Sequence, residues 1–414
     1  MPKGVERKHD DVRMRGFATR HDFAEALALL RARITPLPNE VIPLDDALGR
    51  VLAEDIIARV DVPHFDRSAV DGYGLRARDT FGASDYNLIP LTLKGEVLPG
   101  CILDLSLSEN EAVRIMTGAP LPLGADAVVM AEYAEEEGGT VNILQPIAPY
   151  KNVGRIGEDI RKGDVVLTRG RRLRPQDLGV LASIQAARVS VYRRPRVALL
   201  ITGNELVEVG QPLTGCHIMD SNSFTLSGLA RRLGALPVRK GIIRDDYALI
   251  KKAIQEAAED VVIVTGGTSV GAEDFAPLII QDLGELVVHG VAMRPSSPAG
   301  FGFIQQRPIF LIPGNPVSAL VTFDAFVGPT LQLMQGLEPA YPYAKVRGKL
   351  ARKIASAIGR VDFVRVRLTD TGVDPLRVTG ASILSSTTRA DGFVIVDKNS
   401  EGLDEGEEVE VYVY

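Results

Sequence analysis

The chain has 414 residues, of which 45% are hydrophobic and 24% charged, a composition typical of a globular protein with several domains. Its formal charge is −6, with 47 basic and 53 acidic residues, so binding to nucleic acid is not expected. Cys101 and Cys216, the only cysteines, lack zinc-type spacing, which disfavours a zinc site and structural disulfides and indicates a reducing, cytoplasmic compartment. The apolar runs are strand-sized, so no membrane span is predicted.

The first part of the chain predicts a tail, a helix and a β-rich domain. Residues 1–20 carry mixed charge and are interpreted as a disordered tail. Asp22 is expected to cap a helix whose apolar residues recur at helical spacing until Pro36 ends the run. Residues 41–57 are interpreted as a turn followed by a helix. Over residues 63–159, short strand-like runs alternate with Gly and Pro, which indicates a small β-rich domain.

The second part of the chain alternates strands with helices. Strands are predicted over residues 197–201, 238–243, 261–264 and 308–312, and helices over residues 222–233, 246–258 and 316–334. This alternation is typical of right-handed βαβ units and predicts a three-layer α/β domain with a parallel-rich sheet over residues 193–335.

Two further domains complete the predicted multidomain α/β plus β architecture. Residues 336–414 contain runs of period two and predict a separate C-terminal domain resembling a β-barrel. Residues 160–192 contain a strand and a helix that are expected to return and pack on the first helix. Residues 21–62 and 160–192 would then form a discontinuous linker domain.

Three glycine-rich loops follow strands of the α/β domain. They are Thr202-Gly203-Asn204-Glu205, Thr265-Gly266-Gly267-Thr268-Ser269-Val270-Gly271 and Pro313-Gly314-Asn315-Pro316. Glycine lets the backbone approach a ligand closely, and helix N-termini with free N–H groups, such as the one expected after Asn315, attract phosphate. One such loop is more often only a strand-to-helix turn, but three at the carboxyl ends of one sheet predict a site for a phosphate-bearing ligand. None of them has the spacing of a P-loop or a dinucleotide-binding loop.

Carboxylates are expected on the same edge of the sheet. Glu205 follows the first strand, Asp245 and Asp246 follow the second, and Asp274 follows the third. Acids beside a phosphate would repel it unless a cation lies between them, and Mg²⁺ is the cation that commonly joins carboxylate and phosphate oxygens. The alternative for either Asp245 or Asp246 is a purely structural role as the cap of the following helix.

The β-rich domain carries its own polar segments, each of which is either a functional loop or a structural turn. They are FDRSAVDGYG, MTGAP and GED, at residues 65–74, 116–120 and 157–159.

An ordered series of seven segments resembles the MoeA family of molybdopterin molybdenumtransferases and the homologous E domain of gephyrin. The segments are FDRSAVDGYG, RIMTGAPLPLGADAVVM, GRIGEDIRKGDVV, TGNELVEVGQPL, GIIRDD, VTGGTSVGAEDF and LIPGNPVSALVTF, and the resemblance extends from about residue 20 to the end. It implies a MogA-like α/β domain and a Mg²⁺-dependent enzyme that converts adenylylated molybdopterin and molybdate to molybdenum cofactor and AMP. It also implies a homodimer whose active site lies between the α/β domain of one subunit and the β-rich domain of the other, and handover of substrate from a MogA-like adenylyltransferase.

The resemblance assigns functional positions residue by residue. The catalytic positions are Asp71, Thr117, Asp159, Glu205, Asp245 and Asp274, of which Glu205, Asp245 and Asp274 would hold magnesium. The positions that would bind the pterin phosphates and the oxyanion are Gly266, Gly267, Ser269, Gly271, Arg294, Pro313, Gly314, Asn315, Pro316 and Arg365.

Three positions depart from the family pattern. The family's KPGKP segment is RPSSP at residues 294–298, so Ser297 stands at a lysine position, as does Gly290, while Ala381 replaces a frequent serine. Arg294 and Arg365 are then expected to bind the oxyanion, because planar guanidinium groups favour bidentate contacts.

Three other functions remain open on the sequence. Adenylyl transfer to molybdopterin needs only the α/β domain, so the additional domains disfavour it. A non-enzymatic scaffold is possible on this fold, as gephyrin's receptor anchoring indicates, but the retained acids favour catalysis. The third is insertion of tungsten, which the sequence does not distinguish from insertion of molybdenum.

Overall fold

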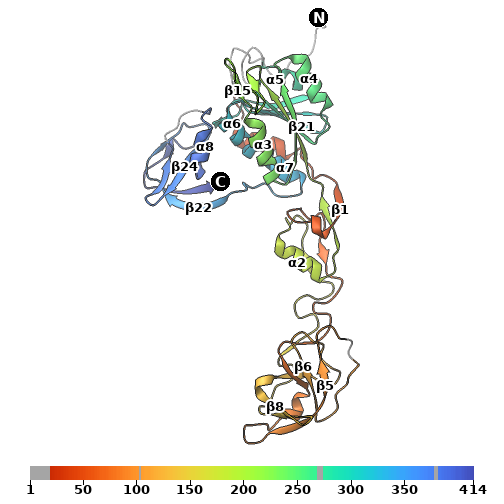
Figure 1. The fold of residues 1–414 in the computed structure, drawn as a ribbon. Coiled ribbons are helices and arrows are strands. Elements are labelled where there is room, and N and C mark those ends of the chain that lie inside the picture. The colour runs from red at the N-terminus through yellow and green to blue at the C-terminus, as the bar shows by residue number, and fades with distance from the viewer. Residues whose placement is uncertain (1–18, 102–103, 268–273, 377–380) are drawn as a thin grey trace. The chain divides into compact units, whose positions relative to one another are not determined.

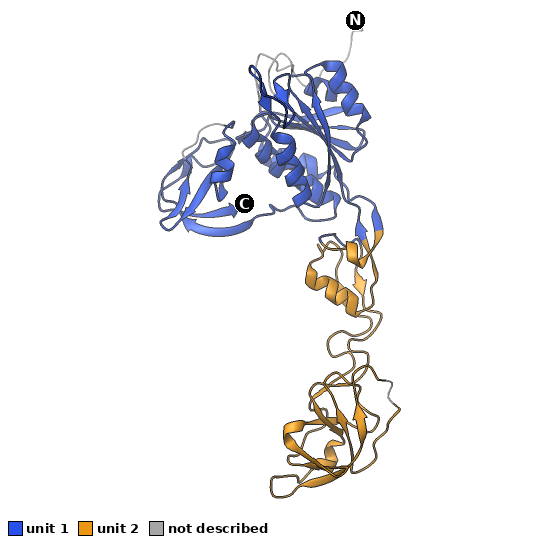
Figure 2. Cartoon of the chain, viewed as in Figure 1, with its two compact units in different colours: residues 1–40, 49–53, 191–414 blue, residues 41–48, 54–190 orange. Residues whose placement is uncertain are grey.

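The computed structural model describes residues 19–101, 104–267, 274–376 and 381–414. The chain divides into two compact units, coloured separately in Figure 2. Unit 1 comprises residues 1–40, 49–53 and 191–414, and unit 2 comprises residues 41–48 and 54–190. Of the tail predicted over residues 1–20, residues 1–18 lie outside the described residues.

The centre of unit 1 is a six-stranded sheet with the strand order β16-β13-β17-β21-β20-β18 (Figure 1). Its strands are β13 (Arg196–Thr202), β16 (Leu236–Ile243), β17 (Val261–Thr265), β18 (Glu285–His289), β20 (Gly300–Ile304) and β21 (Arg307–Ile312). The strands β16, β13, β17 and β21 are parallel to one another, whereas β20 and β18 run antiparallel to their neighbours. The predicted parallel-rich sheet is confirmed.

Helices cover both faces of this sheet. They are α1 (Phe23–Arg31), α3 (Asn222–Arg232), α4 (Tyr247–Glu256), α5 (Ala276–Leu283), α6 (Pro316–Thr322) and α7 (Gly328–Met334). Along β13, Val197, Leu199 and Ile201 face the core shared with α1, α3 and α7, while Ala198 and Leu200 face α4 and α5. Because side chains alternate along a strand, a strand covered on both faces is apolar at every position. The predicted three layers are therefore present.

The helix predicted over residues 316–334 is continuous but changes its winding. A π-helical segment, η4 (Phe323–Val327), joins α6 to α7. Contrary to the sequence prediction, Pro316–Met334 is long and apolar enough to cross a membrane by length and composition. In the structure, 83% of its most apolar window is buried, which is the environment of a core helix.

The sequence analysis grouped the first helix with residues 160–192 in a linker domain. In the structure this helix belongs to unit 1. Asp22 caps α1 as predicted, since its Oδ1 accepts hydrogen bonds from the N–H groups of Ala24 and Glu25. Ala26 and Leu30 are fully buried in the core of unit 1. The apolar stripe of α1 therefore finds its partner on the large sheet domain.

The predicted helix within residues 41–57 is wrong. This segment and its flank contain β1 (Asn39–Pro43), the 3₁₀ turn η1 (Leu44–Asp46) and β2 (Ile56–Ile57). Val41 and Leu48 are exposed, so the apolar spacing does not form a buried helical face. Strand pairing of β2 with β11 satisfies the backbone instead.

The C-terminal part of unit 1 is a second β-structure. Its strands are β22 (Ala344–Lys349), β23 (Ile354–Ala355), β24 (Val361–Thr369), β25 (Gly372–Pro375), β26 (Gly392–Val396), β27 (Gly402–Leu403) and β28 (Glu408–Val413), with one short helix, α8 (Ser385–Arg389). The main sheet has the order β19-β24-β26-β28-β22, and β25 pairs with β24. Its first strand, β19 (Met293–Arg294), comes from the α/β segment and pairs in parallel with β24. This pairing joins the two parts of unit 1.

Unit 2 is built on another six-stranded sheet, with the order β7-β4-β6-β5-β9-β8. Its strands are β4 (Gly72–Leu75), β5 (Ile89–Val97), β6 (Glu111–Ile115), β7 (Ala127–Met130), β8 (Ala134–Glu137) and β9 (Thr140–Ile143), accompanied by the 3₁₀ turns η2 (Ala77–Thr80) and η3 (Ala131–Tyr133). Only the pair β5 and β6 is parallel among these neighbours. The β-rich character predicted for this region is confirmed.

Short elements complete the two units. They are β3 (Arg67–Ser68) paired with β10 (Val153–Gly154), β11 (Val165–Leu167) paired with β2, α2 (Pro175–Ser183), β12 (Arg188–Tyr192), and β14 (Leu206–Val207) paired with β15 (Ile218–Met219). At β11 and α2 the chain returns to the first part of unit 2, where β11 pairs with β2 and α2 contacts η1, and the packing predicted on the first helix remains a prediction. The four domain boundaries remain a prediction.

Candidate functional site

The three glycine-rich loops lie together at the carboxyl ends of β13, β17 and β21. The N–H of Gly266 donates to the carbonyl of Ile312 at 3.2 Å, and Thr202 Oγ1 donates to the carbonyl of Thr265 at 3.2 Å. A Cβ on Gly266, where φ is +83°, would stand 2.2 Å from the Thr202 carbonyl oxygen, and one on Gly314 would stand 3.8 Å from the Gly266 Cα. The absence of a side chain at Gly266 is what permits this approach.

Part of the middle loop falls outside the described residues. Ser269 and Gly271, two of the predicted phosphate-binding positions, lie in the undescribed segment 268–273. Gly267 precedes this segment with φ of +55°, and Asp274 follows it as a half-buried residue.

The two aspartates after β16 have different roles. Asp246 caps α4, since its Oδ1 accepts from the N–H of Leu249 at 2.9 Å. The Oδ2 of Asp245 accepts from the N–H of Asn204 at 3.0 Å, and its Oδ1 is buried without a hydrogen-bond partner. Asp245 is therefore the aspartate with an oxygen left for a ligand.

The acids near these loops fit a magnesium ion only in part. Among the residues that the structure describes, no three His, Cys, Asp or Glu side chains lie close enough together to hold a metal. Glu205, Asp245 and Asp274 thus do not form a complete metal site by themselves. The unpartnered Oδ1 of Asp245 still suits a cation, and Mg²⁺ usually takes one or two carboxylates and completes its shell with water and phosphate oxygens. The residues fit a magnesium that binds together with a phosphate ligand.

Glu205 lies against the first loop. A Cβ on Gly203 would stand 2.8 Å from Glu205 Oε2, so the carboxylate folds over the backbone of this glycine. Glu205 therefore lies at the first glycine loop, and its role as a metal ligand remains a prediction.

The start of α6 is less open than predicted. Asn315 occupies the N-cap and Pro316 the first helical position, as expected, and the Asn315 side chain makes no capping bond. The N–H of Val317, however, donates to the carbonyl of Ala381 at 3.0 Å. One N–H of this helix start is thus already used by the C-terminal sheet domain, because that domain packs against it.

Asn222 is a residue of this region that the sequence analysis missed. Its Nδ2 donates to the carbonyl of Gly314 at 2.8 Å, while its Oδ1 is buried without a partner. The sequence feature that could have indicated it is the run of polar residues at the start of a helix after a strand. In this run the Oδ1 of Asp220 accepts a hydrogen bond from the N–H of Ser223 at 3.0 Å. Asn222 joins the third glycine loop to α3.

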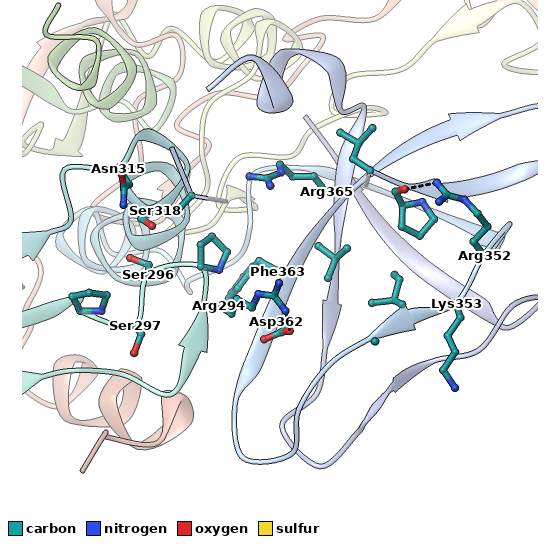
Figure 3. Close-up of a pocket in the computed structure, with 18 residues that line it drawn as sticks. Arg294, Ser296, Ser297, Asn315, Ser318, Arg352, Lys353, Asp362, Phe363 and Arg365 are labelled. Carbon is teal, nitrogen blue, oxygen red and sulfur yellow. Dashed lines mark hydrogen bonds and ion pairs between the residues drawn. The ribbon is translucent and has the colours of Figure 1, made fainter. Parts of the chain in front are cut away.

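A groove of about 670 Å³ lies between the α/β part and the C-terminal sheet of unit 1 (Figure 3). Its polar lining consists of Arg294, Ser296, Ser297, Asn315, Ser318, Arg352, Lys353, Asp362 and Arg365. The structure thus brings together Arg294, Asn315 and Arg365, which the resemblance had named. It adds Arg352 and Lys353, which lie before β23 in a segment without a recognisable motif.

The groove carries more positive than negative charge. Four cationic side chains line it, namely Arg294, Arg352, Lys353 and Arg365, against one acid, Asp362. Asp362 is buried and is bound by Arg360 at 2.8 Å, with Arg294 3.7 Å away. Burial lowers the pKa of the Arg365 guanidinium, which nevertheless stays charged at neutral pH. This charge balance suits a small dianion.

The positions that depart from the family pattern have local structural explanations. Gly290 has φ of +89° and accepts a backbone hydrogen bond from His21, so a lysine there would be strained in this backbone. Ser297 lines the groove with a buried hydroxyl that has no partner. Ala381 contributes its carbonyl to Val317. Arg294 remains the cation of this segment.

In unit 2, two of the predicted catalytic residues are in direct contact. Asp71 Oδ1 accepts hydrogen bonds from both the N–H and the Oγ1 of Thr117, each at 2.7 Å. These bonds hold the pKa of the exposed Asp71 carboxyl below its ordinary value. Asp159 lies on another loop, where its N–H donates to the carbonyl of Val62.

Comparison with known proteins gives consistent matches along the whole chain. The MoeA N-terminal region (domain I and II) matches residues 21–184, a probable molybdopterin binding domain matches residues 198–333, and the MoeA C-terminal region (domain IV) matches residues 347–414.

Individual relatives agree with these family matches. The chain is 38% identical over 384 residues to a putative molybdopterin biosynthesis protein of Methanocaldococcus jannaschii, covering 90% of this chain and 91% of the relative. It is 35% identical over 384 residues to the molybdopterin molybdenumtransferase of Haemophilus influenzae, covering 91% and 94%. The crystal structure of the molybdopterin biosynthesis MoeA protein of Pyrococcus horikoshii is similar with a TM-score of 0.85 and 36% identity, covering 95% and 99%.

These matches define a multidomain protein with a probable molybdopterin binding α/β domain, a β-rich domain and a C-terminal β-domain. The chain belongs to the MoeA family and is an enzyme of molybdenum cofactor biosynthesis. The family and the fold class predicted from the seven sequence segments are both confirmed.

We predict that Gly266→Ala disrupts the junction of the glycine loops. The added methyl group would overlap the Thr202 carbonyl, and φ of +83° would strain any other residue, so the free energy of unfolding should fall by about 2–4 kcal/mol in urea titration. Gly406→Ala is the matched control, because its φ is +79° with nothing within 4 Å, and it should lose about 1 kcal/mol. Equal losses in the two variants would contradict the close approach.

Proposed function

We propose that this protein is a molybdopterin molybdenumtransferase, which inserts molybdate into adenylylated molybdopterin and releases AMP. The observation that carries the proposal is the electropositive groove of about 670 Å³ beside the start of α6. Both substrates are anions, so a site for them needs cations on a protein that is acidic as a whole. The relative from Haemophilus influenzae that carries this name is similar over nearly its full length.

The groove is proposed to bind molybdate. Arg294 and Arg365 come from β19 and β24, and their planar guanidinium groups can each offer two N–H donors to a tetrahedral oxyanion. Arg352 is held by Asp374, whose Oδ1 accepts from its Nε at 2.7 Å, which fixes this cation at the edge of the groove. In a partly buried groove these charges act more strongly than they would in water.

The glycine loops are proposed to bind the pterin phosphates through the backbone N–H groups of Gly267, Ser269, Gly271, Gly314 and Asn315. Asn204 holds one oxygen of Asp245, which leaves the other for magnesium together with Glu205 and Asp274. When bound, the ion would neutralise charge that develops as the phosphoanhydride is cleaved. The protein's own part is to orient the anhydride beside the oxyanion.

We also propose that two chains form a homodimer in which Asp71, Thr117 and Asp159 of one subunit complete the site of the other. Support comes from Asp71, an exposed carboxylate whose orientation is fixed by two hydrogen bonds from Thr117. A side chain held in this way is suited to orienting a substrate group.

The proposal extends to the setting of the enzyme. Cys101 and Cys216 are exposed free cysteines, which fits a reducing cytoplasm. The adenylylated substrate would come from a separate MogA-like adenylyltransferase, because the reaction proposed here consumes an adenylate and does not form one.

The function is tested by incubating purified protein with adenylylated molybdopterin, magnesium and molybdate and measuring AMP. Asp245→Asn should lower AMP release at least about 100-fold, because the metal loses a carboxylate while the bond to Asn204 persists. Asp246→Asn is the control and should stay within about twofold, because asparagine also caps α4.

Two outcomes would contradict this proposal. If folded wild-type protein releases no AMP in response to molybdate, the transferase activity is wrong. If it instead forms adenylylated molybdopterin from ATP, the adenylyl-transfer alternative replaces it. Equal activities of the two aspartate variants would remove Asp245 from the metal site.

A second prediction concerns the oxyanion groove. Arg294→Met should raise the KM for molybdate about tenfold with a smaller effect on kcat, because it removes binding contacts and leaves the anhydride site intact. Arg347→Met, an exposed position on β22 outside the groove, should leave both constants unchanged. Titration with tungstate in parallel measures which oxyanion is preferred. A loss of stability without a change in KM would make Arg294 structural.

A third prediction concerns the dimer. Asp71→Asn and Asp245→Asn should each be inactive, but random mixing of their subunits should restore about a quarter of wild-type activity, because half of the dimers are mixed and each has one intact shared site. Size measurement by light scattering checks the dimer itself. No recovery on mixing, in dimers shown to exchange subunits, would place both residues in the same subunit's site.

A further inference from the structure

A buried acid lies in the long helix of unit 1, away from the glycine loops. Asp324 belongs to the π-helical segment η4, and its side chain is only 4% exposed. Its Oδ2 accepts a hydrogen bond from the hydroxyl of Tyr343 at 2.6 Å, and its Oδ1 lies 3.5 Å from Nη2 of Arg232. The same Nη2 donates to the Tyr343 hydroxyl at 2.7 Å. We call these three residues the Asp324 cluster.

The Asp324 cluster joins three elements. Asp324 comes from the helix that begins at α6, Arg232 is the last residue of α3, and Tyr343 directly precedes β22 of the C-terminal domain. The Arg232 guanidinium also stacks over the Tyr343 ring at 4.5 Å, and this ring contacts Phe393 with a centroid distance of 5.5 Å. The cluster therefore fixes the C-terminal domain to the helical layer of the α/β domain.

The Asp324 cluster is continuous with the wall of the groove. A small cavity of about 10 Å³ is lined by Asp324, Phe363, Arg365 and Tyr414, among others. Phe363 and Arg365, which are labelled in Figure 3, also line the large groove, so these two side chains border both the groove and the cavity at Asp324. The helix that carries Asp324 begins at the groove, where Asn315 and Ser318 form part of the opposite wall. A shift of Asp324 would therefore displace side chains on both walls of the groove.

Keeping this acid buried carries an electrostatic cost. Burial raises the pKa of Asp324 to about 6, against the opposing effects of the Tyr343 hydrogen bond and the Arg232 charge. The other ionisable groups near its charge are Arg365, Tyr341 and Tyr414, and burial raises the pKa of Tyr341, Tyr343 and Tyr414 as well. Near neutral pH Asp324 is mostly ionised. An apolar residue would pack there without this cost, which suggests a role other than stability.

We propose that Asp324, acting through Tyr343 and Arg232, is a positioning residue that sets the separation of the two walls of the groove in which the oxyanion binds. The proposal rests on the function proposed above. Asparagine could not replace the carboxylate, because it has one acceptor oxygen for two donors and its amide group would face the Arg232 guanidinium. The walls would then lose their fixed spacing, although the fold is retained.

The test compares Asp324→Asn and Tyr343→Phe with the control Tyr341→Phe. Tyr341 belongs to the same aromatic cluster, packing against Phe393 and Tyr412. Each of the first two variants should raise the KM for molybdate about tenfold at pH 7.5 with a smaller change in kcat, and the control should not. An unchanged KM in Asp324→Asn would overturn the proposal.

The dependence on pH separates positioning from a merely structural role. Because the pKa of Asp324 is raised on folding from 3.8 to about 6, its contribution to stability is complete below pH 3.8 and is lost as the pH rises through 6. The difference in Tm between wild type and Asp324→Asn should therefore be smaller at pH 8 than at pH 5. The KM of wild type for molybdate should rise as the pH falls from 7.5 to 5.5 and Asp324 is protonated. The part of this rise that comes from Asp324 should be absent in Asp324→Asn. Identical pH profiles of KM for wild type and Asp324→Asn would contradict the proposal.

Hydrogen exchange keeps this test independent of the assigned activity. Asp324→Asn should speed the exchange of backbone amides in β24 and at the start of α6, whereas the control should not. If wild type releases no AMP, the proposed function fails, and the exchange of these two segments still tests the positioning role. Exchange equal to wild type would overturn it.

Discussion

The site depends on the parallel pairing of β13, β17 and β21 inside a sheet that helices cover on both faces. This pairing places the carboxyl ends of the three strands at one edge, so the loops that leave them must share the same space. Gly266 lies against the carbonyl of Thr202 because it has no side chain to keep the two backbones apart. The dense apolar layers on both faces hold the strand ends in this position, and the loops can therefore present backbone N–H groups without strand movement.

Unit 1 contains a groove lined mainly by cations, although the protein as a whole is acidic. Cations gather in the groove between the α/β part and the C-terminal sheet, where the buried Asp362 is paired with the partly exposed Arg360. Asp245 keeps one carboxylate oxygen without a partner at the glycine loops. The unpartnered oxygen of Asp245 costs free energy in the folded protein, and a bound cation would supply its missing partner.

The C-terminal domain is as much a part of the site as the loops are. Backbone pairing of β19 with β24, the bond between Val317 and Ala381, and the Asp324 cluster are three of the points that attach it to the α/β domain. Two of these points flank the groove directly. A domain attached in this way can hold Arg365 and Arg294 in one groove, and Asp324, in the π-helical segment η4, lies at the interface.

Local chemistry alone determined much of this protein. Asp22 as a cap, the strand over residues 197–201 and the helix over 316–334 follow from turn residues and periodicity, and seven ordered segments were enough to indicate the family. Only the tertiary structure decided that Asp246 caps a helix while Asp245 stays available, that α1 packs on the large sheet, and that Arg352, Lys353 and Asn222 join the site. The reason is physical, because a capping bond, a buried face or a shared groove is set by contacts between residues that are far apart in the chain, and no local pattern contains them.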